Sequence, residues 1–336
     1  MNLSKISQVL SLEPKYRLKQ AMDCVYKEFI DDWMKAKNMP IQLREQLNKE
    51  CPLRINAEIF EDKNSKKALI TFDDQSRVET VLMMQGEERN SVCVSSQVGC
   101  PLRCDFCATG KLGLKRCLTT DEIVAQVLLW ERLLKAKGEH VDNVTFMGMG
   151  EPLLNYDNVI GAIKIINSKE CLNIGARKIS ISTAGIIEGI KKLSNEPYQI
   201  NLALSMHTPD EEMRSVLMPV NRKYPIGEVL KEVGDYIKKT KRKVMIEYIM
   251  IEGINDSIKT AEKLAETLKK NLKHLFMVNL IPANPTGKYK ASSSKNIDNF
   301  RKTLESNGIT VTQRFRFGRS IKAACGQLAA QKVVKA

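Results

Sequence analysis

The sequence predicts an α/β protein whose body is a parallel sheet, either open or closed as a partial barrel. The main observation is that apolar strand-like segments alternate with helical segments along most of the chain beyond Val92, as in repeated βα units. The second observation is length, because 336 residues exceed one average domain and admit two domains, or one large barrel with an appendage. With 43% hydrophobic and 27% charged residues, the composition is that of an ordinary globular protein.

Residues 1–52 are predicted to form a small helical module. Apolar residues between Leu10 and Ile30 recur close to the 3.6-residue period of a helix, and Pro40 favours the start of another short helix. Residues 53–88 change character, because ALITF and RVETVLM alternate or run apolar like two strands joined at 73–75. We expect a β-hairpin there, between the helical module and the body.

The body is predicted over 89–312, with 313–336 as a basic C-terminal tail. Strands are expected at SVCVSS, VTFMG, KISISTA, INLALSMH, KVMIEYIMI and FMVNLIP, with a last short strand near VTQRF. Helices are expected at about 120–137, 157–167, 186–194, 226–239, 257–270 and 294–306. In such a series the chemistry gathers at the carboxyl ends of the strands, so the residues that follow each strand are the candidates.

The nine cysteines favour metal or redox chemistry over stable disulfides, although Cys24, Cys51, Cys117 and Cys171 are expected only to pack or to lie at the surface. The N-terminal segment lacks the apolar run of a signal peptide, and no stretch of about 18 apolar residues is present to span a membrane. We therefore expect a cytoplasmic protein with no membrane partner. A reducing compartment disfavours stable disulfides.

The net charge of +14 indicates a polyanionic partner, with a basic surface kept only for solubility as the alternative. Five basic residues fall within 238–243. The tail from 313 to 336 holds no acid and six basic residues, namely Arg314, Arg316, Arg319, Lys322, Lys332 and Lys335. This clustering favours the polyanion.

Cys100, Cys104 and Cys107 follow the first predicted strand of the body with the spacing C-x3-C-x2-C. A structural zinc site closes its tetrahedron with four ligands, whereas three thiolates on a [4Fe–4S] cluster leave one iron open for another molecule. No second cysteine pair follows at zinc-finger spacing, so the cluster is favoured and zinc or chance grouping is the alternative.

With Phe106 as the aromatic residue before the third cysteine, this motif resembles the signature of the radical S-adenosylmethionine (SAM) superfamily. The resemblance implies a partial (β/α)6 barrel and one [4Fe–4S] cluster held by three cysteines. It also implies that the open iron binds SAM and that reductive cleavage yields a 5′-deoxyadenosyl radical, with the electron supplied by the cluster.

Residues at the ends of later strands match SAM contacts of this superfamily and of a narrower family within it. In the segment 147–152, MGMGEP, small residues permit close approach and a carboxylate can accept hydrogen bonds. The matching positions are Gly150, Glu151, Ser182, Ser205, Met206, His207 and Asn284. A neutral core histidine is the alternative for His207.

The narrower family is the adenine-carbon methyltransferases of 23S ribosomal RNA, RlmN and Cfr. Three segments carry the resemblance: CVSSQVGC at 93–100, MGMGEP at 147–152 and AACGQL at 323–328. It implies methylation of a 23S rRNA adenine, with tRNA as a further substrate, two SAM molecules per turnover, a flavodoxin or ferredoxin system as electron donor, and a monomer. Carbon 2 is expected rather than the carbon 8 of Cfr, because Pro152 follows Gly-Glu where Cfr-like sequences carry alanine.

The resemblance also assigns three catalytic residues. Cys325 takes a methyl group from SAM on its sulfur, since an amidine-type ring carbon is electrophilic and cannot attack SAM directly. Cys93 later attacks the Cys325 sulfur, which leaves a transient disulfide, and Glu79 is the general base. Arg319 and Lys322 are expected to favour the Cys325 thiolate, although the family usually carries acids beside this cysteine, where Ser320 and Lys322 stand here. Without the resemblance, free cysteines are often packing residues and strand-edge acids are commonly solvated.

Two alternative functions stay open. One is a radical SAM enzyme with a different substrate, and the other is a non-enzymatic RNA-binding protein with a structural metal. The N-terminal module either docks RNA or caps the barrel.

Overall fold

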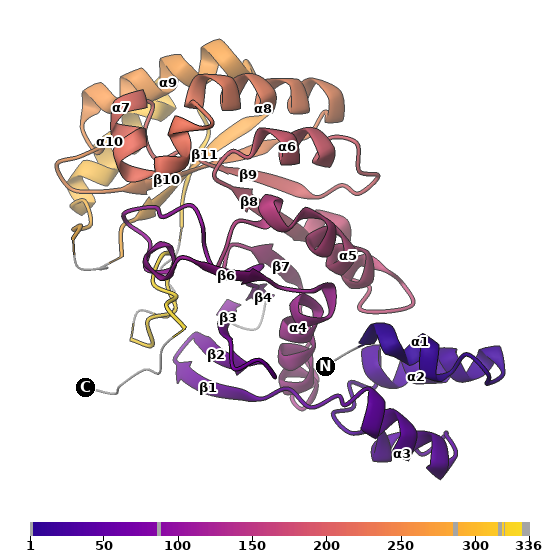
Figure 1. The fold of residues 1–336 in the computed structure, drawn as a ribbon. Coiled ribbons are helices and arrows are strands. Elements are labelled where there is room, and N and C mark those ends of the chain that lie inside the picture. Colours follow the sequence, from indigo (N-terminus) through magenta and orange to yellow (C-terminus); the bar gives the residue numbers. More distant parts are fainter. Residues whose placement is uncertain (1–2, 86–88, 285–287, 315–317, 319, 331–336) are drawn as a thin grey trace.

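A computed structural model describes residues 3–330, apart from 86–88, 285–287, 315–317 and 319. The N-terminal helices lie together at one side of the molecule (Figure 1). They are η1 (Leu3–Lys5), α1 (Ile6–Val9), α2 (Lys15–Tyr26), η2 (Trp33–Lys35) and α3 (Ile41–Glu50). Trp33 is fully buried among them, and its indole nitrogen donates to the Cys51 carbonyl at 2.8 Å. The predicted helical module is present.

The predicted hairpin is part of a longer antiparallel meander. Its strands are β1 (Ala57–Asp62), β2 (Ser65–Thr71), β3 (Arg77–Gln85) and β4 (Arg89–Cys93). The hairpin of β2 and β3 was expected. In the structure its register places Leu69 opposite Glu79. The extra strand β1 was not, because AEIFED carries three acids and lies at the exposed sheet edge.

Strand β4 leads the meander into a parallel sheet. The parallel strands are β4, β7 (Asn143–Phe146), β8 (Ile179–Thr183), β9 (Asn201–Ser205), β10 (Val244–Met250), β11 (Phe276–Pro282) and β12 (Val311–Gln313). The order in space is β1-β2-β3-β4-β7-β8-β9-β10-β11-β12. Among the described residues β1 and β12 do not pair, so the barrel stays open, as predicted.

Helices cover the outer side of the curved sheet (Figure 1). They are α4 (Thr120–Lys135), α5 (Tyr156–Asn167), α6 (Ile187–Leu193), α7 (Glu211–Leu217), α8 (Ile226–Thr240), α9 (Ile258–Leu272) and α10 (Ser294–Ser306). Each expected helix is present within a few residues, and the six βα units of the predicted barrel are confirmed. Helix α7 is additional. No helix of the described part combines the length and apolarity needed to cross a bilayer.

A small second sheet was also not expected. It pairs β5 (Gln97–Gly99) with β6 (Leu114–Cys117), and both strands are too short to show a pattern in the sequence. The remaining short turns of helix are η3 (Thr109–Leu112), η4 (Pro152–Asn155), η5 (Ala176–Lys178) and η6 (Pro219–Arg222).

Candidate active site

A cavity of about 820 Å³ runs through the centre of the barrel. Alternate residues of each strand face it, as the two-residue period of a strand requires. Many of these residues are small or polar: Ser91, Asn143, Thr145, Ser180, Ser182, Asn201, Ser205, Asn279 and Thr312. Closed barrels usually fill this space with bulky branched side chains. Here the interior is hollow and can admit a ligand.

The loop that carries Cys100, Cys104 and Cys107 joins β5 to β6 at the carboxyl edge of the barrel, and all three cysteines line the cavity. Its base is tight at Gly99, where φ is +79° and an added Cβ would meet the Gly113 oxygen at 1.8 Å. Only glycine fits this close backbone approach. The small sheet therefore fixes where the loop begins and ends.

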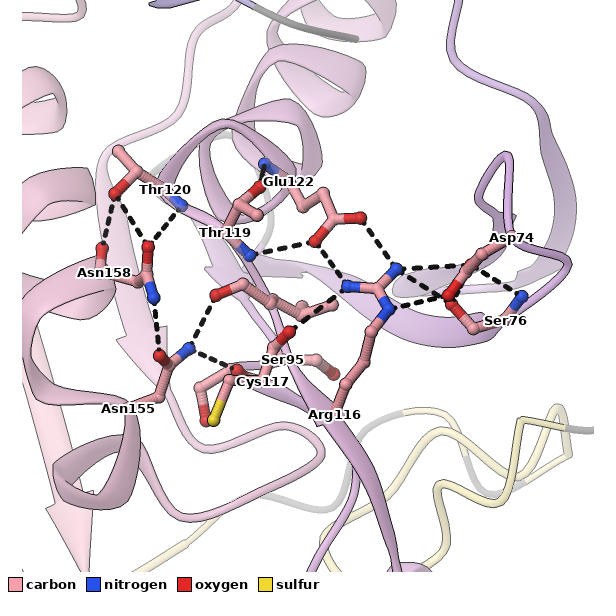
Figure 2. A network of polar contacts seen from close by, with 12 residues as sticks. Asp74, Ser76, Ser95, Arg116, Cys117, Thr119, Thr120, Glu122, Asn155 and Asn158 are labelled. Atoms are coloured by element: carbon pink, nitrogen blue, oxygen red, sulfur yellow. Dashed lines mark hydrogen bonds and ion pairs between the residues drawn. The ribbon is translucent and has the colours of Figure 1, made fainter.

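A polar network centred on Arg116 of β6 holds this sheet against the rest of the protein (Figure 2). Its guanidinium donates to Asp74 in the β2–β3 turn at 2.7 Å and to Glu122 of α4 at 2.8 Å. On the other side, the Asn155 amide donates to the Ser96 and Leu118 carbonyls at 2.8 and 2.7 Å. The hairpin, the cysteine loop and α4 are thereby tied together.

The three thiols form a donor set that suits an iron–sulfur cluster. Burial raises the pKa of Cys100 to about 12 and that of Cys104 well above its usual value, so a bound metal must displace their protons. In a [4Fe–4S] cluster held by three cysteines, each thiolate binds a different iron and one iron stays open.

Glu151 ends the segment after β7 and is buried at the cavity wall. Its carboxylate accepts from the amides of Leu153 at 3.1 Å and Ala184 at 2.8 Å. Burial nevertheless raises its pKa to about 7, which would favour a cationic ligand group beside it. Gly150, at φ +99°, also lines the cavity, but its missing side chain makes room for Gln97 rather than for a ligand.

Three of the four further candidates on or directly after β8 and β9 lie on the same wall. Ser182 and Ser205 line the cavity with their hydroxyls 3.3 Å apart. Burial lowers the pKa of His207 to about 3; its Nδ1 accepts from the Ile249 amide at 3.1 Å, and its ring meets Phe106 edge to face at 4.9 Å. Met206 is fully buried and is not among the lining residues.

Residues 320–330 of the C-terminal tail pack beside the cysteine loop. The Ala108 amide donates to the Gly326 carbonyl at 2.8 Å, and the Thr109 hydroxyl donates to the Leu328 carbonyl at 2.6 Å. Asn284 donates to the Cys325 carbonyl at 3.1 Å, while its own amide oxygen is buried without a protein partner. These contacts hold Cys325 at the cavity, where its side chain is exposed.

Cys93, at the end of β4, faces the same cavity as Cys325. Burial, together with the nearby Cys325 sulfur, raises the pKa of Cys93 to about 11. The partly buried Arg314 lies beside both sulfurs: the negative charge of a Cys325 thiolate raises the pKa of Arg314, and Glu247, 3.7 Å from it, acts in the same direction. The structure thus brings the two cysteines together around a cation.

Arg314 is a cation beside Cys325 that the sequence analysis did not indicate. Lys322 is exposed, and Arg319 lies outside the described residues, as do Arg316, Lys332 and Lys335. Arg314 follows β12, and Thr312, Gln313 and Arg314 all line the cavity, so strand alternation does not single it out.

Glu79 lies on β3 and is not among the residues that line the cavity, although Val81 and Met83 on the same face of this strand are. It is 1% exposed and pairs at 2.6 Å with Lys67, which is 2% exposed. Its second oxygen accepts from the Ala329 amide at 2.8 Å. The carboxylate is therefore joined to the same tail that carries Cys325. Lys67 was not predicted, because lysines in a strand are ordinarily solvated.

Buried Arg214 of α7 was also not predicted. Its guanidinium donates to the carbonyls of Ala184, Ser205 and Met206, at 2.7, 3.2 and 3.2 Å. It ties together the ends of β8 and β9, where the candidate SAM contacts lie.

The open barrel and the three-cysteine loop define a radical SAM enzyme, and the Radical SAM superfamily model matches residues 94–266. A crystal structure of a radical SAM methyltransferase from Sphaerobacter thermophilus superposes with a TM-score of 0.93, at 38% identity over 98% of each chain.

Curated relatives are similar over nearly the whole chain. The "Probable dual-specificity RNA methyltransferase RlmN" of Dictyoglomus thermophilum is 44% identical, over 95% of this chain and 91% of the relative. The "Ribosomal RNA large subunit methyltransferase N" of Nitrosopumilus maritimus is 41% identical, over 94% and 92%. The chain belongs to the RlmN family and is a radical SAM RNA methyltransferase, which implies a [4Fe–4S] cluster and SAM as cofactors and an RNA substrate.

Proposed function

We propose that this enzyme methylates carbon 2 of an adenine in 23S ribosomal RNA, and of an adenine in tRNA, through a methyl group carried on Cys325. The observation that carries the proposal is the meeting of Cys325 and Cys93 in one cavity with the three loop cysteines and Arg314. Packing alone gives no reason for five thiols to line one hollow chamber. The names of the relatives, which refer to large-subunit ribosomal RNA and to dual specificity, support the choice of substrates.

Three cysteines, Cys100, Cys104 and Cys107, would hold one cluster, and the wall formed by Gly150, Glu151, Ser182, Ser205, His207 and Asn284 would hold SAM. Glu151 offers a carboxylate and Asn284 an unpartnered amide oxygen to the SAM amino group. When bound, the cluster supplies the single-electron chemistry that produces a radical from SAM, which no side chain can supply.

Cys325 first accepts the methyl group on its sulfur, beside the Arg314 cation. The cluster and a second SAM molecule would supply the radical chemistry that removes one hydrogen from this methyl group, bonds its carbon to the adenine carbon and takes back one electron. Glu79 then takes the ring proton. Cys93 attacks the Cys325 sulfur, which forms a disulfide, breaks the bond from sulfur to the bridging carbon and leaves that carbon to take up a proton and become the new methyl group.

Glu79 can act as this base only after the tail moves away from it, because its carboxylate is 1% exposed, does not line the cavity and is bound to the Ala329 amide. We therefore propose that the tail shifts during each turnover. A thiol or the electron donor must reduce the disulfide before the next cycle.

The test is an anaerobic reaction of the reconstituted enzyme with SAM, reductant and unmodified 23S rRNA fragment, followed by mass spectrometry of the digested RNA. We expect 2-methyladenosine from the wild type and none from Cys325→Ala. A Cys93→Ala variant should leave RNA covalently joined to Cys325, because the resolving thiol is missing. Formation of 8-methyladenosine would overturn the carbon-2 assignment, and product from Cys325→Ala would overturn the carrier role.

We further propose that the enzyme works in the cytoplasm as a monomer, with a flavodoxin or ferredoxin as its electron donor. The described cysteines are all free thiols, which fits a reducing compartment. Sedimentation of the reconstituted protein, alone and with RNA, tests the monomer.

A further inference from the structure

The cavity reaches the amino edge of the barrel as well as the carboxyl edge. Its lining includes the residues that begin strands, such as Arg89 of β4, Asn143 of β7 and Asn201 of β9. At the other edge, the cysteine loop and the tail with Cys325 line it. The chamber therefore has a second approach, on the side away from the thiols.

Charge is distributed unevenly between these two edges. Four cations line the amino edge, and we call them the basic rim: Arg89, Arg177, Lys178 and Lys243. Arg177 and Lys178 end η5 directly before β8, and Lys243 directly precedes β10. Together with Arg89 of β4, the cations therefore come from every second strand of the run β4-β7-β8-β9-β10. All four side chains are exposed.

The acids of the described lining, Glu151 and Glu247, are both buried and lie nearer the thiols. The partners of the basic rim leave most of its charge in place. Arg177 donates to Gln199 at 2.6 Å and Arg89 donates to Gln85, and both acceptors are neutral amides. Asp142 lies 3.7 Å from Lys178, and it is also 3.3 Å from His140.

We propose that the basic rim binds the phosphates of the RNA loop that carries the target adenine, and that the base enters the barrel from the amino edge. This inference rests on the proposed function. Along β4, four residue steps separate Arg89 from Cys93, roughly 13 Å at the rise of a strand. A base in a stacked helix cannot enter such a chamber, so the nucleotide must be unstacked while its neighbours' phosphates stay at the rim. Phosphate contacts of this kind position the RNA without reading its sequence.

The test measures binding of a fluorescein-labelled 23S rRNA stem-loop to the reconstituted enzyme by anisotropy over a range of salt concentrations. The variants are Arg177→Gln/Lys178→Gln and Arg89→Gln/Lys243→Gln. The matched control is Lys259→Gln/Lys295→Gln, which removes the same charge from the first turns of α9 and α10, at the opposite edge of the barrel. Iron content and far-ultraviolet circular dichroism check that each variant folds.

We expect each rim variant to weaken binding about 10-fold and to reduce the slope of log Kd against log salt by roughly 1.4, as for two lost phosphate contacts on single-stranded RNA. The control should stay within about 2-fold of the wild type. Equal weakening in the control would overturn the proposal, because it would show only a general effect of charge. Unchanged RNA binding with slower reduction by a flavodoxin would also overturn it and assign the rim to an acidic protein. The anisotropy experiment measures binding without turnover, so its result is independent of the methylation test. If the rim variants weaken RNA binding but the wild type forms no 2-methyladenosine, the proposed function is refuted and this inference still stands.

Discussion

Lys67 and Glu79 form an ion pair of 2.6 Å in which both side chains are almost completely buried, 2% and 1% exposed. Such a pair costs much of its attraction in lost hydration, so it is a poor device for stability alone. The second carboxylate oxygen of Glu79 accepts a hydrogen bond from the Ala329 amide, in the tail that carries Cys325. The pair therefore links the candidate base to the position of the methyl carrier.

Replacing Lys67 by Met should destabilise the protein by about 3–5 kcal/mol, because an unpaired carboxylate remains buried. The double variant Lys67→Met/Glu79→Met should recover most of this loss. Urea unfolding under anaerobic conditions gives the free energies. Lys66→Met is the matched control, since Lys66 pairs with the exposed Glu61, and it should cost at most about 1 kcal/mol. If Lys67→Met and Lys66→Met lower the free energy of unfolding by the same amount, burial of the Lys67–Glu79 pair does not make its loss more costly.

Arg314→Gln should slow alkylation of Cys325 by iodoacetamide about 5- to 10-fold at neutral pH, because it removes the cation that lies beside the reacting sulfur. Arg314→Lys should retain part of the rate. The control is Lys322→Gln, which removes the exposed cation three residues before Cys325 and should leave the rate unchanged. Mass spectrometry of the Cys325 peptide from the reconstituted enzyme measures each rate. A larger effect of Lys322→Gln would mean that Lys322, and not Arg314, promotes the reaction of Cys325.

Gly99→Ala should prevent the enzyme from holding its cluster. Its Cβ would stand 1.8 Å from the Gly113 oxygen, so the base of the cysteine loop must open. Gly138→Ala is the matched control: it has a similar φ of +73° but nothing within 4 Å of its Cβ, and it lies after α4, away from the cysteine loop, so it should cost only about 1 kcal/mol of backbone strain. Iron content and absorbance near 400 nm after reconstitution report the outcome, and a fully loaded Gly99→Ala protein would disprove the geometric role.

Glu131 of α4 gives a test by pH. Burial raises its pKa to about 7, and one of its oxygens has no protein partner. The folded state therefore holds this proton more tightly than the unfolded state, and stability falls as pH rises from about 4.5 through 7. Glu131→Gln removes this loss, so the variant should exceed the wild type by about 1–3 kcal/mol at pH 8, with a smaller difference at pH 5.5. A difference that does not change with pH would refute the titration of Glu131.

Much of this structure could be predicted from the sequence, and the missing parts have physical reasons. The βα repeats of the barrel follow strong periodic patterns, and the cysteine spacing marks the metal loop. Strands β1 and β5 are too acidic or too short to show a pattern. Lys67 and Arg314 gain their roles only from long-range packing, against Glu79 and Cys325, which a local pattern cannot reveal.

The family resemblance named Cys93, Glu79 and Cys325, which no spacing rule connects along the chain. Their arrangement shows why, since three separate segments meet only when the tail folds back over the carboxyl edge of the barrel. It was also not predictable that Glu79 would stay outside the cavity lining, because the tail that covers it contacts its second oxygen through the Ala329 amide.

The hollow interior of the barrel has a consequence for how this scaffold can change. In most domains a buried position is constrained by the demand to fill space, and enlarging its side chain strains the fold. Ser91, Ser180 and Asn201 face empty volume instead, so larger residues can be placed there while the outer helices keep the protein folded. New specificity for a different nucleotide can therefore evolve, or be designed, in the chamber lining with little effect on folding.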